Sequence, residues 1–207
     1  MNCLICGNPF YSAPTWRKLF LYEVDASTCN RCYSKFQKAD TAVDFLDFKG
    51  TIYEEAVDSV TALYAYNEAM KSYLHQYKFL QDVALATVFA TDLSQLFENK
   101  EGIVVPIPMH LEKLQIRTFA QVDELLNSAS IPFKHLLVKT ATSEQGKKSK
   151  KERLKATPLF EVIGKVEEKT YILFDDIYTT GTTIHHAAKV LKDAGAKKVE
   201  AITLIKG

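Results

Sequence analysis

The stretch KTYILFDDIYTTGTTIHHAAKVLKDAGAKKVEAITLIK, Lys169–Lys206, decides the fold. Its first part, Lys169–Phe174, is an apolar run typical of a buried strand. Ile184–Gly195 repeats apolar residues at helical spacing and ends on a glycine, which is typical of a helix. Lys197–Lys206 indicates a second strand. This order predicts a βαβ unit with a right-handed crossover, and therefore an α/β fold whose sheet is parallel.

The loop that joins the first strand to the helix combines two kinds of chemistry. Several threonines surround one glycine at the start of the helix, where backbone N–H groups and hydroxyls can hold a phosphate: Thr179, Thr180, Gly181, Thr182 and Thr183. No lysine follows, so this is not a Walker A loop. The adjacent acids Asp175 and Asp176 would repel a phosphate, but they suit vicinal hydroxyls or a magnesium shell. One ligand with both a phosphate and a ribose diol would satisfy the whole loop.

The run ILFDDIYTTGTT closely resembles the phosphoribosyl pyrophosphate (PRPP) signature of type I phosphoribosyltransferases. That signature has an apolar strand, two acids, two variable residues and a T-T-G-x-T loop. The resemblance implies that Asp175 and Asp176 face the 2′ and 3′ hydroxyls of the ribose, and that Thr179–Thr183 hold the 5′-phosphate. It also implies a type I phosphoribosyltransferase-like core. His185 and His186 follow the signature, and we interpret them as ordinary helix residues.

All four cysteines lie in two C-x2-C pairs near the amino terminus, separated by 22 residues. Two such turns can wrap a tetrahedral metal, and structural zinc is the leading interpretation for Cys3, Cys6, Cys29 and Cys32. Iron with the same ligands is an alternative, and a redox role is weaker because neither pair opens a helix in a βαβ unit. Gly7 follows the first pair, where such a turn often needs positive φ. The spacer is predicted to be a short hairpin or loop in a zinc-ribbon-like finger.

The middle of the chain is predicted to be a folded core. Ala56–Asn67 indicates one or two strands, and Asn67 can cap the following helix, whose core-facing residues are Met70, Tyr73, Leu74 and Tyr77. Asp82–Lys100 indicates one amphipathic helix. Ile103–His110 predicts a short buried strand ending in a stiffened loop. Leu111–Ala129 is interpreted as a loop leading into a helix, with Arg117 at the helix start.

Lys139–Pro158 is polar and strongly basic. It is either a solvated loop or a flexible loop that closes over a polyanion. No low-complexity tract or internal repeat is visible in the chain. We expect two domains, a finger over residues 1–40 and a phosphoribosyltransferase-like domain over residues 41–207.

The whole chain resembles the competence ComF (ComFC) family. The features that carry this resemblance are the four-cysteine finger, the segment YKFLQD, the strand and loop VVPIPMH, and a downstream R-x-F-x-Q. It implies that Lys78 lies in a pyrophosphate-side loop, that Arg117 and Gln121 fall on an R-G-F-N-Q motif, and that Lys151 and Arg153 belong to the flexible basic loop. The chain departs from the family at Thr118 and Gln81, which replace glycines, and at Ala120 and Ala156, which replace asparagines.

Composition limits the functions that this chain can have. The 207 residues are 47% hydrophobic and 25% charged, and the formal net charge is +1. Such a chain buries a sizeable core, and its bulk charge predicts no extensive nucleic-acid footprint. With no basic and apolar leader before Cys3 and no apolar run long enough to span a bilayer, we expect a cytoplasmic protein.

Three hypotheses for the function follow from these motifs. The family resemblance implies a role in DNA uptake during natural transformation, with single-stranded DNA and a helicase-like ATPase (ComFA type) as partners. Exposed aromatics such as Phe10, Tyr11 and Trp16 could stack on DNA bases. The second hypothesis is a phosphoribosyltransferase that uses PRPP and Mg²⁺, with an acceptor that the sequence does not specify. The third is a sensor that binds a phosphoribosyl ligand without turning it over.

Overall fold

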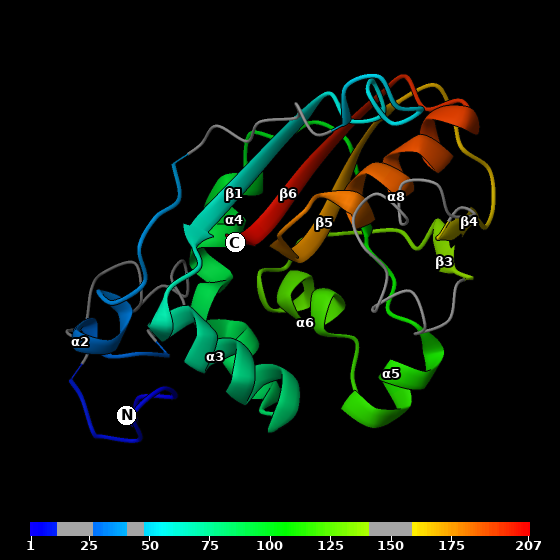
Figure 1. Ribbon diagram of the computed structural model, residues 1–207. Helices are drawn as coiled ribbons and strands as arrows, with labels where there is room; N and C mark the ends of the chain where they lie inside the picture. Colours follow the sequence, from blue (N-terminus) through cyan, green and yellow to red (C-terminus); the bar gives the residue numbers. More distant parts are fainter. Residues whose placement is uncertain (12–26, 41–47, 141–158) are drawn as a thin grey trace.

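The structure, a computed structural model, describes residues 1–11, 27–40, 48–140 and 159–207 (Figure 1). Most of the cysteine spacer, Trp16, and the basic-loop residues Lys151, Arg153 and Ala156 therefore lie outside the described residues. The helices are α2 (Asn30–Tyr33), α3 (Glu68–Phe79), the 3₁₀ helix η2 (Val83–Phe89), α4 (Ala90–Phe97), α5 (Leu111–Arg117), α6 (Gln121–Ser128) and α8 (Thr182–Asp193). The strands are β1 (Ser59–Ala65), β2 (Ile103–Pro106), β3 (Leu137–Lys139), β4 (Phe160–Val162), β5 (Thr170–Tyr178) and β6 (Lys198–Lys206).

The main sheet has four strands in the order β1-β6-β5-β2, and every pair in it is parallel. The predicted βαβ unit is confirmed as β5, α8 and β6, whose strands pair from Thr170 with Lys198 to Tyr178 with Lys206. β3 and β4 form a separate antiparallel pair. They flank residues 141–158 in the sequence, so the basic stretch connects the two strands of this small sheet.

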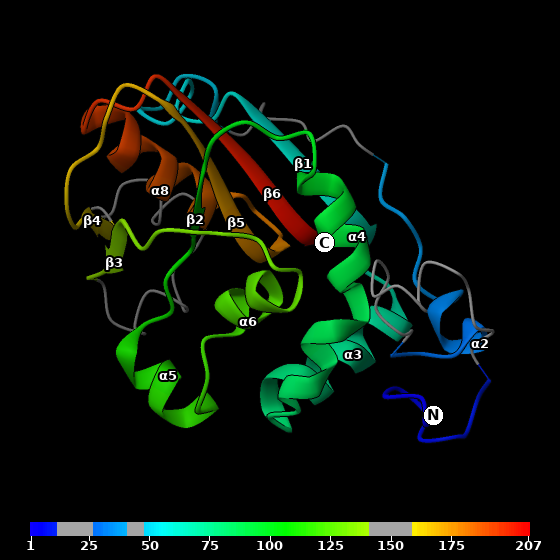
Figure 2. The ribbon, with the colours of Figure 1, turned by 180° about the vertical axis from the view of Figure 1, so that it is seen from behind.

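Side-chain alternation along β5 supplies a hydrophobic core on each face of the sheet. Ile172 and Phe174 pack into the cluster that contains α3, η2, α4 and α6. Tyr171 and Leu173 point the other way, into the cluster that contains α8. Figures 1 and 2 show α8 on one face and the other helices on the opposite side and beyond the carboxyl ends of the strands. This three-layer arrangement confirms the predicted fold class.

Several local predictions hold. Asn67 caps α3, because its Oδ1 accepts a hydrogen bond of 2.9 Å from the N–H of Met70. The four predicted core residues of this helix are all buried: Met70, Tyr73, Leu74 and Tyr77. Ala56–Asn67 contains one strand, β1, and Ile103–His110 contains β2.

Other local predictions are wrong. The segment predicted to be one helix, Asp82–Lys100, is a 3₁₀ helix followed by an α-helix that ends at Phe97. Leu111–Arg117, interpreted as a loop, is α5, so Arg117 ends a helix and does not begin one. β5 continues to Tyr178, so both acids of the signature lie within the strand and not in the loop after it.

The amino-terminal segment is attached to the main body by side chains that include Phe36, Tyr33 and Lys38. Phe36 is buried against the rings of Tyr64 and Phe89, at 6.3 and 4.9 Å between centroids. Tyr33 donates a hydrogen bond to Asp92, and Lys38 forms an ion pair of 2.7 Å with the same carboxylate. Residues 37–39 also bond to the backbone of β1, with 3.0 Å between the Ala39 nitrogen and the oxygen of Leu63. The edge of the sheet at β1 is therefore covered by the chain that leaves the cysteine cluster.

Candidate functional site

The two acids of β5 lie near the carboxyl end of the strand, where open α/β sheets place their ligand sites. Adjacent residues of a strand point to opposite faces, so alternation places Asp176 on the face of Phe174 and Asp175 on the face of Leu173. α3 covers the face of Phe174. The two carboxylates therefore have different surroundings.

Asp176 forms an ion pair with Lys78, which lies in the last turn of α3. The side chains are only 12% and 10% exposed for Lys78 and Asp176, respectively. The predicted pyrophosphate-side lysine is therefore in the site, but its ammonium group is paired with the carboxylate that the resemblance assigns to the ribose. Because both groups are largely withdrawn from water, their attraction is stronger than that of a surface pair.

Asp175 has an unusually weak acid group. Burial and the neighbouring charge of Asp176 raise the pKa of its carboxyl from 3.8 to about 7. The ammonium groups of Lys78 and Lys139 and the N–H of Asp176, 2.8 Å from Oδ1, act in the opposite direction and only partly offset the rise. Near neutral pH the acid pair therefore carries less than two full negative charges, which reduces its repulsion of an incoming phosphate.

The predicted phosphate cradle connects β5 to α8. Gly181 is the N-cap of α8 with φ 71°, the left-handed region that favours glycine. The hydroxyls of Thr180 and Thr182 are 3.0 Å apart, and no side chain caps the helix. The first N–H groups of α8 therefore remain available to an anion within a helix of 12 residues.

A tyrosine closes one side of this cradle. A Cβ built on Gly181 would collide with the hydroxyl of Tyr178 and would lie 2.6 Å from its Cζ. Tyr178 itself is buried. Gly181 is thus required both for its backbone conformation and for the space that the tyrosine ring occupies.

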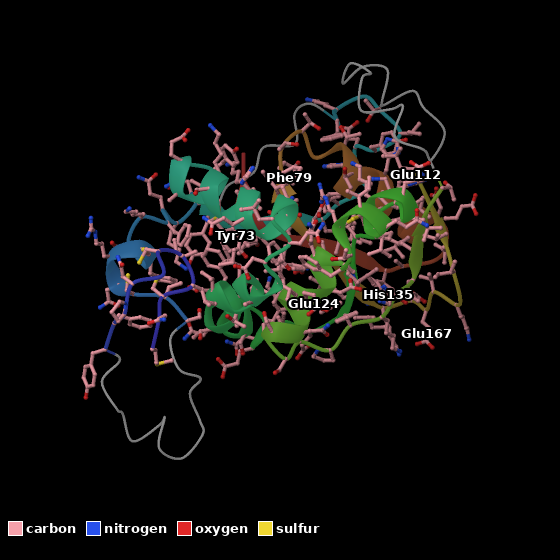
Figure 3. All side chains as sticks on the ribbon, turned by 90° about the horizontal axis from the view of Figure 1, so that it is seen from below. Tyr73, Phe79, Glu112, Glu124, His135 and Glu167 are labelled. Atoms are coloured by element: carbon pink, nitrogen blue, oxygen red, sulfur yellow. The ribbon has the colours of Figure 1, made fainter. Side chains whose placement is uncertain are left out.

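Arg117 and Gln121 also lie together, at the junction between α5 and α6. The guanidinium Nη1 of Arg117 donates to Oε1 of Gln121 at 2.5 Å. Gln121 is completely buried, and its backbone oxygen accepts a hydrogen bond of 2.7 Å from the hydroxyl of Tyr77. The Arg117 guanidinium lies 5.5 Å from the ring centroid of Phe79, the residue after Lys78. Figure 3 labels Phe79, which ends α3. The structure therefore brings Lys78, Arg117 and Gln121 to one side of the site.

The two positions where glycines of the family motifs are replaced have an unexpected geometry. Gln81 and Thr118 both adopt left-handed backbone, with φ of 58° and 63°. Nε2 of Gln81 donates to the backbone oxygen of Ile116 at 2.9 Å, and the Thr118 hydroxyl lies 3.4 Å from Oε1 of Gln81. These side chains tie the loop after α3 to the end of α5, which glycines could not do.

Lys139 is a site residue that the sequence reasoning missed. It ends β3, its Nζ lies 5.6 Å from the ring centroid of Phe160, and it contributes to the electrostatics of Asp175. Burial lowers the pKa of the Lys139 ammonium, and Lys113 lowers it further, whereas Asp175 raises it. Only its place at the start of the basic stretch could have suggested it, because 36 positions separate it from Asp175 in the chain.

A second site is formed by the cysteines. The sulfurs of Cys3, Cys6, Cys29 and Cys32 all lie within 4.8 Å of one another, so they can hold a metal ion. Tetrahedral zinc with bonds of about 2.3 Å would bring thiolate sulfurs to about 3.8 Å, so the four ligands fit with a small contraction. Burial opposes ionisation of Cys3, but backbone N–H groups, that of Cys29 first, lower its pKa to about 6. Gly7 has φ 71°, as predicted.

Of the aromatic residues proposed to stack on DNA, Tyr11 is 83% exposed and Phe10 is partly buried. His185 and His186 are buried in α8 and stack on Phe48 and Tyr53. These contacts support the interpretation of both histidines as structural. Among the described residues, no helix is both long and apolar enough to cross a membrane.

Comparison with known proteins finds a matching family and several similar proteins. Residues 71–207 match the phosphoribosyl transferase domain family. The chain is 32% identical to competence protein ComFC of Bacillus subtilis, over 99% of this chain and 94% of that protein. It is 34% identical to competence protein ComFC of Streptococcus pneumoniae, over 100% of both chains. A hypoxanthine phosphoribosyltransferase structure from Staphylococcus aureus matches 61% of this chain and 62% of its own, with 15% identity and a TM-score of 0.35.

Proposed function

The chain belongs to the ComFC family and contains a phosphoribosyl transferase domain, and on this basis we propose that it serves DNA uptake in natural transformation. Within that role it binds a phosphoribosyl ligand at the end of β5 and single-stranded DNA through its amino-terminal finger and basic loop. The expected location is the cytoplasm.

One observation carries the proposal of a phosphoribosyl ligand. β5 ends with two adjacent acids at the carboxyl edge of a parallel sheet. The helix that follows, α8, begins at a glycine and has no side-chain cap. Helix N–H groups suit the 5′-phosphate, and Asp175 and Asp176 suit the ribose hydroxyls. Lys78 pairs with Asp176, and a pyrophosphate would extend on that side of the site. Asp175 and Asp176 would hold magnesium, which would supply positive charge to offset the negative charge of the ligand phosphates.

Calorimetric titration with PRPP and Mg²⁺ tests this proposal. Wild-type protein should bind, and the Asp175→Ala, Asp176→Ala variant should not. Asp193→Ala, at the exposed end of α8, is a matched control that should bind normally. Absence of binding to wild type would refute a PRPP-type site.

Catalysis is a separate question that the same protein can answer. A transferase would release pyrophosphate from PRPP in the presence of its acceptor, and the residues around the acids could assist by position and charge. Binding without release across candidate acceptors would support a non-catalytic sensor. The Gln81 and Thr118 bridge favours the sensor, since it stiffens loops that the family motifs leave to glycine.

The finger supplies the second half of the proposed function. We assign its metal as structural zinc because four thiolates close the site. Tyr11 follows the first cysteine pair in the chain, is exposed and suits base stacking. A helicase-like ATPase of ComFA type is the proposed protein partner.

Single-strand binding should weaken in Tyr11→Ala and in Cys29→Ser, and it should decrease with salt because phosphate contacts release counterions. Asn8→Ala, at another exposed position of the finger, is the control for Tyr11. Full DNA binding and transformation by a folded Cys29→Ser variant would exclude a role for the metal-bound finger.

A further inference from the structure

The carboxylate of Asp176 is already occupied by a group of the protein itself. Its partner is the Lys78 ammonium, and both side chains are about nine-tenths buried. Any ligand hydroxyl or cation that engages Asp176 must compete with this ammonium. Displacement leaves the lysine in a largely dry site without its counter-charge, which is strongly unfavourable.

The surroundings limit where the displaced ammonium can go. Lys78 lies in the last turn of α3, and the loop that follows is held by the hydrogen bonds of Gln81 with Ile116 and Thr118. The Arg117 guanidinium lies 5.5 Å from the ring centroid of Phe79, the neighbour of Lys78 in the chain. The Lys78 side chain is only 12% exposed, so a displaced ammonium has little solvent to move into and needs a new anion close by.

From this geometry we propose that Lys78 is a specificity-determining residue that selects a ribose phosphate carrying a pyrophosphate over ribose 5-phosphate. This inference rests on the proposed phosphoribosyl site. Both ligands offer a diol to Asp176 and a phosphate to the cradle at Gly181. Only the pyrophosphate gives the displaced Lys78 a replacement anion. Lys78 thus opposes ligands that lack the pyrophosphate and assists those that have it.

Calorimetry with Lys78→Met tests the inference, because methionine keeps much of the volume and removes the charge. In the presence of Mg²⁺, we expect PRPP to bind more weakly and ribose 5-phosphate to bind more tightly than in wild type. The ratio of the two affinities should fall by at least about tenfold. Lys100→Met removes a more exposed ion pair, that of Lys100 with Glu200, and should leave the ratio unchanged.

Two outcomes would overturn the inference while leaving the proposed function intact. In the first, both ligands bind wild type and their ratio is unchanged in Lys78→Met. In the second, PRPP binding weakens but ribose 5-phosphate binding is unaffected, which describes a simple pyrophosphate contact. If wild type binds neither ligand, the proposed function itself fails.

Amine labelling of wild-type protein provides a measurement that does not depend on a variant that folds. Reaction of Lys78 with an acylating reagent, followed by mass spectrometry, should be slow in the free protein. It should accelerate with saturating ribose 5-phosphate and Mg²⁺, which frees the ammonium, and remain slow with PRPP. The labelling rate of Lys100 serves as the internal reference. Equal protection of Lys78 by both ligands would contradict the inference.

Discussion

At the scale of the residue, Asp175 makes stability depend on pH. Its pKa is near 3.8 when exposed and about 7 in the folded protein, where Asp176, Lys78 and Lys139 face it. Between these values the folded state retains a proton that the unfolded state has lost. The free energy of unfolding should therefore fall as pH rises from about 4 to about 7, by roughly 4 kcal/mol. Asp175→Asn removes this contribution. Urea denaturation should therefore show that the free energy of unfolding of the variant, relative to wild type, increases as pH rises through this range. A constant difference would contradict the expected titration.

Gly181 offers a second test at this scale, with a matched control in the same chain. Gly181 and Gly50 have φ of 71° and 72°, but only Gly181 has a neighbour, the Tyr178 ring, where a Cβ would be. Alanine at either position should incur the left-handed backbone penalty of about 1 kcal/mol. Gly181→Ala should cost about 1–2 kcal/mol more because of the collision, and it should also weaken phosphate binding. Equal thermal shifts for the two variants would show that Tyr178 moves aside freely.

At the scale of the element, the end of α5 is strained. Thr118 is the C-cap in left-handed conformation, which a β-branched residue adopts with difficulty. Thr118→Gly should raise the free energy of unfolding by about 1 kcal/mol if backbone relief outweighs the weak bond to Gln81. Ser130→Gly, at φ 56° after α6, is the control for glycine in a similar conformation without this bond. A loss of stability in Thr118→Gly alone would show that the bond to Gln81 is the stronger effect.

The elements also show what local sequence could predict. The βαβ unit was predictable because strand and helix patterns in Lys169–Lys206 agree with their burial. The prediction of a single helix over Asp82–Lys100 was wrong. The spacing of apolar residues shows only which side of a helical segment is buried, and 3₁₀ and α turns bury nearly the same side. The Lys78–Asp176 pair could not be predicted, since its partners come from α3 and β5 and meet only when the sheet forms.

At the scale of the whole molecule, the cysteine cluster should stabilise the entire chain. Phe36 and Tyr33 follow the second cysteine pair and pack on rings of the main core. Removal of bound metal by a chelator should therefore lower the melting temperature of the whole protein in one transition. Phe36→Ala should reproduce much of this loss, about 3–5 kcal/mol, whereas Tyr11→Ala should not. Separate melting of the finger, with the main transition unchanged, would contradict this coupling.

The position of β6 has a consequence for how the protein is made. β6 lies between β1 and β5, yet it follows both in the chain, and Ser59 pairs with Glu200. As the polypeptide emerges from the ribosome, β1 and β5 therefore have no common neighbour until Lys198–Lys206 has left the exit tunnel. Such distant pairing slows folding and prolongs the exposure of apolar strands. Newly made chains should consequently depend on chaperones until β6 has left the tunnel.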